Sequence, residues 1–350
     1  MKFSISLPLF RDRTQQDPYH QAYELAVLAE ENGIDMVTTG HHHFRPGNQS
    51  DPLTLMATVA ARTSKLRVTT GIFILPIQHP LQVAEQVATI DEASGGRITL
   101  GVGTGWYPPE YESYGVRFAD RGKRMEESLQ ILRKAWTEEN ISWDSPFFQF
   151  SGVTVYPRPV QQPNPPIWVA GGSTVAVQRA ARLGDGWLWG PVENLAKGSA
   201  LGKVYTDACA EAGRPSTVVL RRFGWMKATR REVEETVLPG YCKGLVDHWR
   251  GPVQTDPHMT EERALIERID AGEDVPPAEI VRDRVLWGSP DDVIEQIERF
   301  QQQTACDWIN IGFGQGQPSE DSTYDFIGTP DDHKEIIKLM GREVIPHFKA

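Results

Sequence analysis

One stretch decides the fold: a strand-like run, Asp35-Met36-Val37-Thr38-Thr39, continues into Gly40-His41-His42-His43-Phe44. A helix pattern begins just beyond it, at Ser50-Asp51-Pro52. A strand that passes through a loop into a helix is the unit of α/β proteins, which keep their chemistry at the carboxyl ends of parallel strands. Histidine is also the side chain that exchanges protons most readily near neutral pH. The stretch therefore predicts a reaction site at one end of a parallel sheet.

The alternation of strand-like and helix-like segments continues along the chain. Eight segments read as strands, and each is followed by a helix or a helix-bearing segment; they lie at residues 3–7, 35–39, 66–75, 98–103, 166–170, 186–189, 218–220 and 309–313. Such alternation specifies a parallel sheet, and eight units fit a closed (β/α)8 barrel, the TIM barrel. A doubly wound open sheet is the alternative. We expect one α/β domain over residues 1–350, a TIM barrel with insertions.

Two segments interrupt this alternation. Residues 141–166 are expected to form a small hairpin that turns at Ser151-Gly152, followed by a proline-rich connector. Residues 230–284 are charged and broken by proline and glycine, which indicates irregular helices and an inserted loop. We expect both segments to be additions to the single domain.

Composition excludes several classes of partner. The formal net charge of -11 argues against nucleic acid and anionic membranes, which attract basic surfaces. No run approaches the apolar length of a membrane span. The three cysteines are far apart, as expected for reduced thiols, and the opening strand follows Met1-Lys2 without a signal-peptide pattern. We expect a cytoplasmic protein with no nucleic-acid and no membrane partner.

The histidine triplet has three interpretations. A metal site needs further ligands, and on an extended segment only His41 and His43 point to the same side. No HExxH spacing is present, so we expect no metal. Imidazoles that bond to the backbone would be structural. The interpretation that we favour is general acid/base chemistry or contact with a cofactor.

Two glycine-rich loops follow strands. Gly101-Val102-Gly103-Thr104-Gly105-Trp106-Tyr107 is not a dinucleotide fingerprint, because Pro108-Pro109 stand where the phosphate-binding helix should begin. Its glycines would let a flat ligand approach the backbone, with Trp106 and Tyr107 as walls. A tight turn with core aromatics is the alternative.

The second loop, Ala170-Gly171-Gly172-Ser173, joins a strand directly to a helix. Free backbone N–H groups and the helix dipole favour an anion at such a junction, and Ser173 adds a hydroxyl. Ordinary capping of the helix by Ser173 is the competing explanation. Arg121 is a cation that would strengthen the phosphate interpretation.

Taken together, these features resemble the bacterial luciferase-like flavin monooxygenases, over essentially the whole chain. The matching segments are Gly40–Phe44, Leu75-Pro76 with His79-Pro80, Asp91–Arg97, Gly101–Tyr107 with Glu110, Arg121 with Glu126, Pro157–Pro159, Pro166–Ser173, Gly184–Trp187, Trp287–Pro290 and Val344–Pro346. The weakest stretch is 230–284. The resemblance implies a TIM barrel that binds reduced FMN or the deazaflavin F420 at the carboxyl ends of its strands.

The resemblance also assigns residues. His42 falls on the catalytic histidine, and His41 stands where the luciferases have a glutamate. The non-prolyl cis peptide beneath the flavin ring falls at Gly71-Ile72. Gly103 replaces a cysteine that some luciferases place near the flavin.

For the cofactor phosphate, Gly172, Ser173 and Arg121 fall on the binding positions. Thr104 replaces an arginine, which weakens one phosphate contact. Gly171, Trp106 and Tyr107 complete the expected cofactor site.

The implied activity is a two-component monooxygenase. A separate reductase supplies reduced FMN, and O2 oxygenates a small organic substrate. The insertion at 230–284 would suit a lid that excludes water. The family is often dimeric, so we expect a homodimer. The alternatives are an F420-dependent oxidoreductase that transfers hydride and a flavin-binding protein without turnover.

The choice between cofactors rests on charge. F420 carries an acidic tail, which would be expected to need a basic rim. The loops placed at the cavity mouth are acidic or neutral, and their nearby cations are Arg45, Arg117 and Lys197. We therefore predict FMN.

Overall fold

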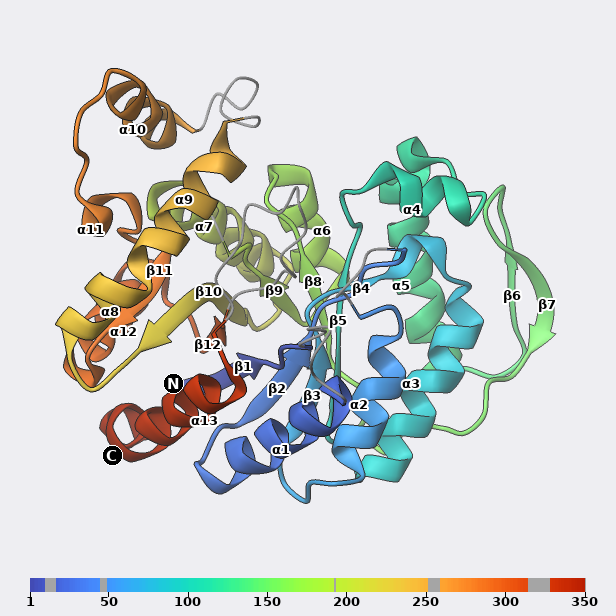
Figure 1. Cartoon of the computed structure of the whole chain (residues 1–350). Coiled ribbons are helices and arrows are strands. Elements are labelled where there is room, and N and C mark those ends of the chain that lie inside the picture. The colour runs from blue at the N-terminus through green and yellow to red at the C-terminus, as the bar shows by residue number, and fades with distance from the viewer. Residues whose placement is uncertain (10–16, 45–48, 192, 251–258, 314–327, 350) are drawn as a thin grey trace.

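The computed structural model describes residues 1–9, 17–44, 49–191, 193–250, 259–313 and 328–349 (Figure 1). Eight parallel strands form a closed ring in which each strand pairs with the next and the last pairs with the first; they are β1 (Lys2–Ser6), β2 (Met36–Thr39), β3 (Arg67–Thr70), β5 (Ile98–Gly103), β8 (Ile167–Ala170), β9 (Gly186–Leu188), β10 (Val218–Met226) and β12 (Trp308–Gly312). The predicted (β/α)8 barrel is confirmed, and its eight strands are those expected from the sequence.

Helices surround the barrel (Figure 1). The larger ones are α1 (Pro18–Glu31), α2 (Pro52–Ala60), α3 (Pro80–Ser94), α5 (Arg121–Thr137), α6 (Thr174–Leu183), α7 (Leu195–Glu211), α12 (Pro290–Thr304) and α13 (Pro330–Leu339). Many begin with proline behind a capping side chain, as at α2, where the Asp51 carboxylate accepts from the Thr54 N–H. None of the described helices is long and apolar enough to cross a membrane.

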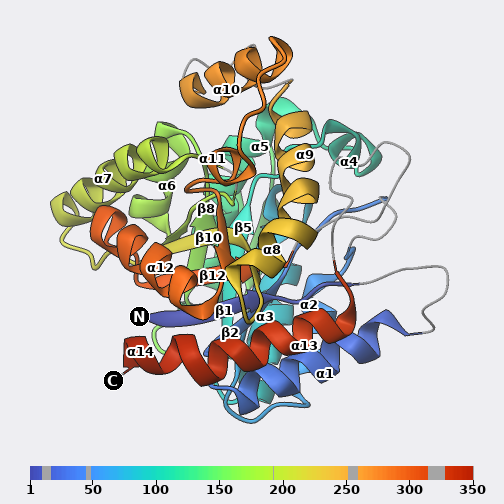
Figure 2. The same cartoon turned by 60° about the vertical axis from the view of Figure 1, so that its left-hand side comes forward.

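The two ends of the chain meet on this helical layer. Figure 2 shows α13 beside α1, with the short α14 (Ile345–Lys349) following the π-helical turn η4 (Met340–Val344). The Lys349 ammonium donates to the Gly33 carbonyl and pairs with Asp35 at 2.9 Å. The last helix is thereby fastened to the turn that leads into β2.

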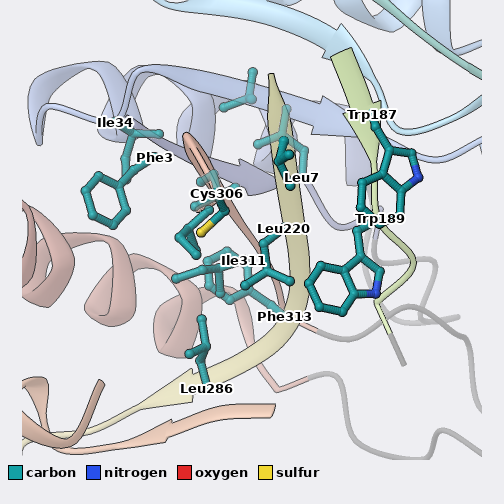
Figure 3. Close-up of a cluster of buried hydrophobic side chains, with 14 of the residues drawn as sticks. Phe3, Leu7, Ile34, Trp187, Trp189, Leu220, Leu286, Cys306, Ile311 and Phe313 are labelled. Carbon is teal, nitrogen blue, oxygen red and sulfur yellow. The ribbon is translucent and has the colours of Figure 1, made fainter. Parts of the chain in front are cut away.

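Strand residues alternate between two apolar layers, as a period of two requires. Outward residues such as Phe3, Leu220 and Ile311 pack against the helices, together with Trp187 and Trp189 of the β9 region (Figure 3). A separate cluster fills the inside of the barrel; its members are Met36, Trp168, Leu188, Val219 and Trp308. The inner layer closes the barrel below its carboxyl end.

Part of the 141–166 segment is a two-stranded antiparallel hairpin of β6 (Ile141–Asp144) and β7 (Gln149–Val153). The turn predicted at Ser151-Gly152 is wrong, because the chain reverses between Asp144 and Gln149. There the Ser145 hydroxyl accepts from the Phe147 and Phe148 N–H groups, which stabilises the turn.

The 230–284 segment contains helices α8 (Arg230–Thr236), α9 (Leu238–Trp249), α10 (Thr260–Asp270) and α11 (Pro277–Ile280). A further strand, β11 (Val285–Gly288), was not predicted. β9 pairs with residues 218–219 of β10. β11 pairs with residues 223–226 of β10, the part that extends beyond the end of β9. The sheet therefore extends outside the closed ring.

Smaller elements connect the barrel units: β4 (Phe73–Ile74), α4 (Pro108–Ser113) and the 3-10 turns η1 (Leu75–Ile77) and η2 (Phe118–Asp120). β4 pairs with the end of β5. The predicted continuous strand at 66–75 is thus two strands, β3 and β4, separated by Gly71-Ile72.

Candidate active site

A cavity of about 530 Å³ lies at the carboxyl ends of the barrel strands. Its walls come from β10 and from the segments that follow β2, β3, β5, β8 and β9; the lining residues are Gly40, His41, His42, Gly71, Ile72, Ile74, Gly103, Thr104, Gly105, Trp106, Ala170, Gly171, Gly172, Leu188, Gly190, Pro191, Glu193 and Arg221. The size is that of a site for a small organic ligand or a cofactor ring. TIM barrels keep their active sites at this end.

Most of the residues predicted from the sequence line this cavity. His42, Gly71, Ile72, Gly103, Thr104, Trp106, Gly171 and Gly172 do so, and Tyr107, Arg121 and Ser173 do not. Tyr107 packs its ring against Trp106 at 5.6 Å between centroids. No described residue of 230–284 lines the cavity, so the lid expected there finds no support in the described part of the insertion.

One wall consists of backbone rather than side chains. The Gly71-Ile72 peptide is cis. A Cβ atom on Gly71 would lie 2.4 Å from Thr38 Oγ1, and one on Gly103 would lie 3.0 Å from Ile72 Cγ1. Glycine is therefore required at Gly71 for packing, and both positions leave the wall flat. A planar ring can approach such a wall closely.

His42 is held by a buried carboxylate. Its Nδ1 lies 3.1 Å from Glu110 Oε1, and the same oxygen accepts from the His43 N–H at 2.8 Å. Glu110 is fully buried in the first turn of α4. The carboxylate fixes the orientation of the His42 ring, which lies edge-on to Trp106 with 5.9 Å between ring centroids.

The two flanking histidines are neutral. His41 Nδ1 accepts from the Ile74 N–H at 3.0 Å, and burial together with the two neighbouring imidazoles lowers the pKa of His41 to about 3. His43 Nδ1 lies 3.0 Å from the Tyr114 hydroxyl, and burial lowers the pKa of His43. These two rings hold the loop; His41 also lines the cavity beside His42, whereas His43 does not. Among the described residues, no group of three potential metal ligands is present.

The predicted phosphate region is only partly assembled. Ser173 caps α6 by accepting from the Ala176 N–H at 3.4 Å, and Gly171 and Gly172 border the cavity beside it. The Arg121 guanidinium instead donates to the Phe118 carbonyl at 2.9 Å and covers the Phe118 ring.

A carboxylate also stands at this end of the cavity. A Cβ atom on Gly172 would lie 2.0 Å from Glu193 Oε1, so this carboxylate rests against the glycine. Of the cations expected nearby, Lys197 lies 3.8 Å from Glu193 and Arg117 lies 3.7 Å from Asp120. Arg45 lies outside the described residues. Both described cations therefore lie close to a carboxylate.

Sequence reasoning missed two residues of the site. Glu110 was noted only as a matching residue, because its contact with His42 spans 68 residues of sequence. Arg221 of β10 was not considered, although it lines the cavity. The available signal was the alternation along β10, which places Val219 and Arg221 on the same inward face.

A closed (β/α)8 barrel with an oriented histidine and a glycine-walled cavity at its carboxyl end defines a TIM-barrel enzyme. The model of the luciferase-like monooxygenase family matches residues 1–306, and the chain belongs to this family. The predicted family is thereby confirmed.

Individual relatives use two cofactors. The FMNH(2)-dependent dimethylsulfone monooxygenase of Pseudomonas putida is 34% identical over 169 residues, 46% of each protein, so the chain spans about half the length of that relative. The F420-dependent glucose-6-phosphate dehydrogenase of Nocardia farcinica (strain IFM 10152) is 27% identical over 359 residues, 97% of each. The crystal structure of monooxygenase RslO1 from Streptomyces bottropensis superposes with a TM-score of 0.82 at 24% identity, over 99% of this chain and 100% of that one. The last likeness shows the fold alone.

Proposed function

We propose that this protein is the oxygenase of a two-component flavin monooxygenase. It uses reduced FMN from a separate reductase, together with O2, to oxygenate a small organic substrate. The observation that carries the proposal is the His42–Glu110 pair at a cavity with a flat glycine wall. We further propose that it works in the cytoplasm as a homodimer.

The residues present fit a flavin ring. Gly71, Ile72 and Gly103 supply a flat surface, and Trp106 closes one side of the cavity. When bound there, reduced FMN supplies the electrons that activate O2. The apolar side chains of Ile72 and Leu188 would keep water from the reacting atoms, which favours oxygenation over wasteful reaction with water.

His42 is the group that moves a proton. Its Nδ1 is taken by Glu110, so exchange with a bound molecule uses Nε2. The buried carboxylate fixes the ring and stabilises the positive charge that His42 acquires when it takes up a proton. The neutral His41 and His43 keep this loop in place and stay outside the proton transfer.

The phosphate would bind at the start of α6. The N–H groups of Gly171 and Gly172 and the Ser173 hydroxyl are the donors, aided by the helix dipole. Thr104 lines the cavity in the place of a cation, and Arg121 would have to leave Phe118 to take part.

An F420-dependent oxidoreductase is the second candidate. It is favoured by the relative that matches over 97% of both chains and uses F420. A flavin-binding protein without turnover is less favoured, because a simple binder has no need of a buried carboxylate that orients a histidine.

The test follows the reoxidation of reduced flavin. Anaerobic protein with reduced FMN is mixed with O2, and flavin absorbance is recorded with and without protein. We expect the protein to change the rate of reoxidation, and His42→Ala to alter that effect while binding remains. Reoxidation at the rate of free FMN, or substrate turnover with F420 under strict anaerobiosis, would contradict the proposal.

A further inference from the structure

Arg221 places a positive charge inside the barrel. Along β10, Val219 belongs to the inner cluster and Leu220 to the outer one, so Arg221 points inward again. It stands in register with Asn310 of β12, whose side chain donates to the Ser4 hydroxyl at 2.9 Å. This layer is polar and lies just above the apolar inner cluster. Arg221 also lines the cavity.

The guanidinium of Arg221 has no partner in the described part of the chain. Its Nε atom is buried without a hydrogen bond, and no described acid forms an ion pair with it. Burial lowers the pKa of Arg221 to about 10, which leaves the group charged at neutral pH.

The fully buried Arg222 and Arg284 differ from Arg221 because their guanidinium groups donate hydrogen bonds, although no described acid pairs with Arg222. Arg222 donates to the carbonyls of Asp283 and Gly190, and Arg284 pairs with Glu262 at 2.8 Å. Arg221 is only partly buried because it borders the cavity, and leaving its charge without a partner there is costly. An anion bound in the cavity would remove this cost.

The position of Arg221 separates it from the expected flavin wall. In the ring of eight strands, β10 lies four strands from β3 in either direction. Arg221 is therefore across the cavity from Gly71-Ile72, which follow β3. Glu193, the acid that shares the cavity, rests against Gly172 and lies 3.8 Å from Lys197 rather than pairing with Arg221. Arg221 therefore attracts an anion, and Glu193 opposes a second anion at the end proposed for the flavin phosphate.

We infer that Arg221 determines specificity, and that the substrate is a small organic oxyanion, a carboxylate or sulfonate with an apolar body. The planar guanidinium matches either head group through two parallel hydrogen bonds. The apolar body would lie along Leu188 toward Ile72. This inference rests on the proposed function only in calling the bound anion the substrate.

The experiment measures ligand binding without flavin, reductase or turnover. Calorimetry compares benzoate with benzamide, and benzenesulfonate with benzenesulfonamide, so that each anion has a neutral counterpart of similar shape. The wild-type protein should bind at least one anion about tenfold more tightly than its neutral counterpart. Arg221→Met should lose this preference and Arg221→Lys should keep part of it.

Arg117→Met is the matched control. It removes one positive charge from an exposed side chain outside the cavity, so it should retain the full anion preference. Binding of reduced riboflavin by Arg221→Met checks that the cavity is intact and that the residue does not serve the flavin.

Three results would overturn the inference: no anion preference in the wild type, including no binding of any probe; an equal preference in Arg221→Met; or weaker binding of reduced riboflavin by that variant. If the proposed function is wrong but the inference is right, the protein shows the anion preference without monooxygenase activity. If the inference is wrong but the proposed function is right, the protein is an active monooxygenase without the anion preference. The two claims therefore fail separately.

Discussion

At the scale of single residues, the proposed chemistry depends on the His42–Glu110 pair. His42→Ala removes the proton-transfer group, and turnover should fall by a factor on the order of 10²–10⁴ with nearly unchanged affinity for reduced FMN. Glu110→Gln keeps the acceptor for the His43 N–H but removes the charge, so its loss should be smaller. Steady-state kinetics and anaerobic titration of each variant measure both effects. Normal turnover in a folded His42→Ala protein would remove His42 from the mechanism.

The low pKa of His41 leads to a separate prediction about the stability of the protein in acid. Its folded pKa of about 3 lies below the ordinary histidine value of 6.5. The unfolded chain therefore binds the extra proton between these values, so stability is fully present above pH 6.5 and is lost as the pH falls toward 3. His41→Asn keeps an acceptor for the Ile74 N–H but cannot titrate.

Between pH 6.5 and 4, the wild type should lose on the order of 2 kcal/mol more unfolding free energy than His41→Asn, by urea denaturation. Parallel pH profiles for the two proteins would show that His41 is not held neutral by the fold.

Some residues of the candidate site can be predicted from the sequence and others cannot. His42, Gly71 and Gly172 stand directly after strands, so their arrival at one cavity follows from the topology of the barrel. Glu110 gains its partner only through tertiary packing, because α4 must bring its first turn to the loop after β2. Arg221 and Arg222 are adjacent within a strand, and an arginine there could face the barrel interior or the outer helices. Only the alternation that starts from the inward Val219 identifies Arg221 as the inward one.

At the scale of elements, the start of α6 and the loop after β9 form the proposed phosphate region. Glu193 rests against Gly172, and a phosphate bound there would be repelled by it. Glu193→Gln should therefore strengthen binding of reduced FMN, and Ser173→Ala should weaken it by roughly 1–3 kcal/mol, as for hydrogen bonds to charge.

Reduced riboflavin, which lacks the phosphate, is the control ligand for these variants. Its affinity should change far less with either substitution, and Arg121→Ala belongs in the same series. Equal changes in affinity for riboflavin and FMN would contradict the proposal that the phosphate binds at the start of α6.

The sequence predicts some elements better than others, and the difference has a physical reason. Barrel strands are buried on both faces and alternate with helices, so the pattern alone identifies them. β11 is a short strand that follows a charged insertion, and it exists because the far half of β10 extends past β9. The hairpin turn at Ser145–Phe148 depends on side-chain hydrogen bonds to the backbone, whereas Gly152 only offers conformational freedom.

At the scale of the whole molecule, charge is the basis on which we propose FMN rather than F420. The formal net charge is -11, and Glu193 lies beside the expected phosphate with Lys197 already near it. The acidic tail of F420 would therefore meet no described basic rim. This supports FMN, although the relatives include users of both cofactors.

The most direct test of the central claim is an anaerobic calorimetric titration of the purified protein with reduced FMN and with reduced F420. The account predicts a dissociation constant of roughly micromolar or below for reduced FMN. It predicts a dissociation constant for F420 that is at least about tenfold larger. Tighter binding of F420 than of reduced FMN would contradict the account and favour the hydride-transferring oxidoreductase.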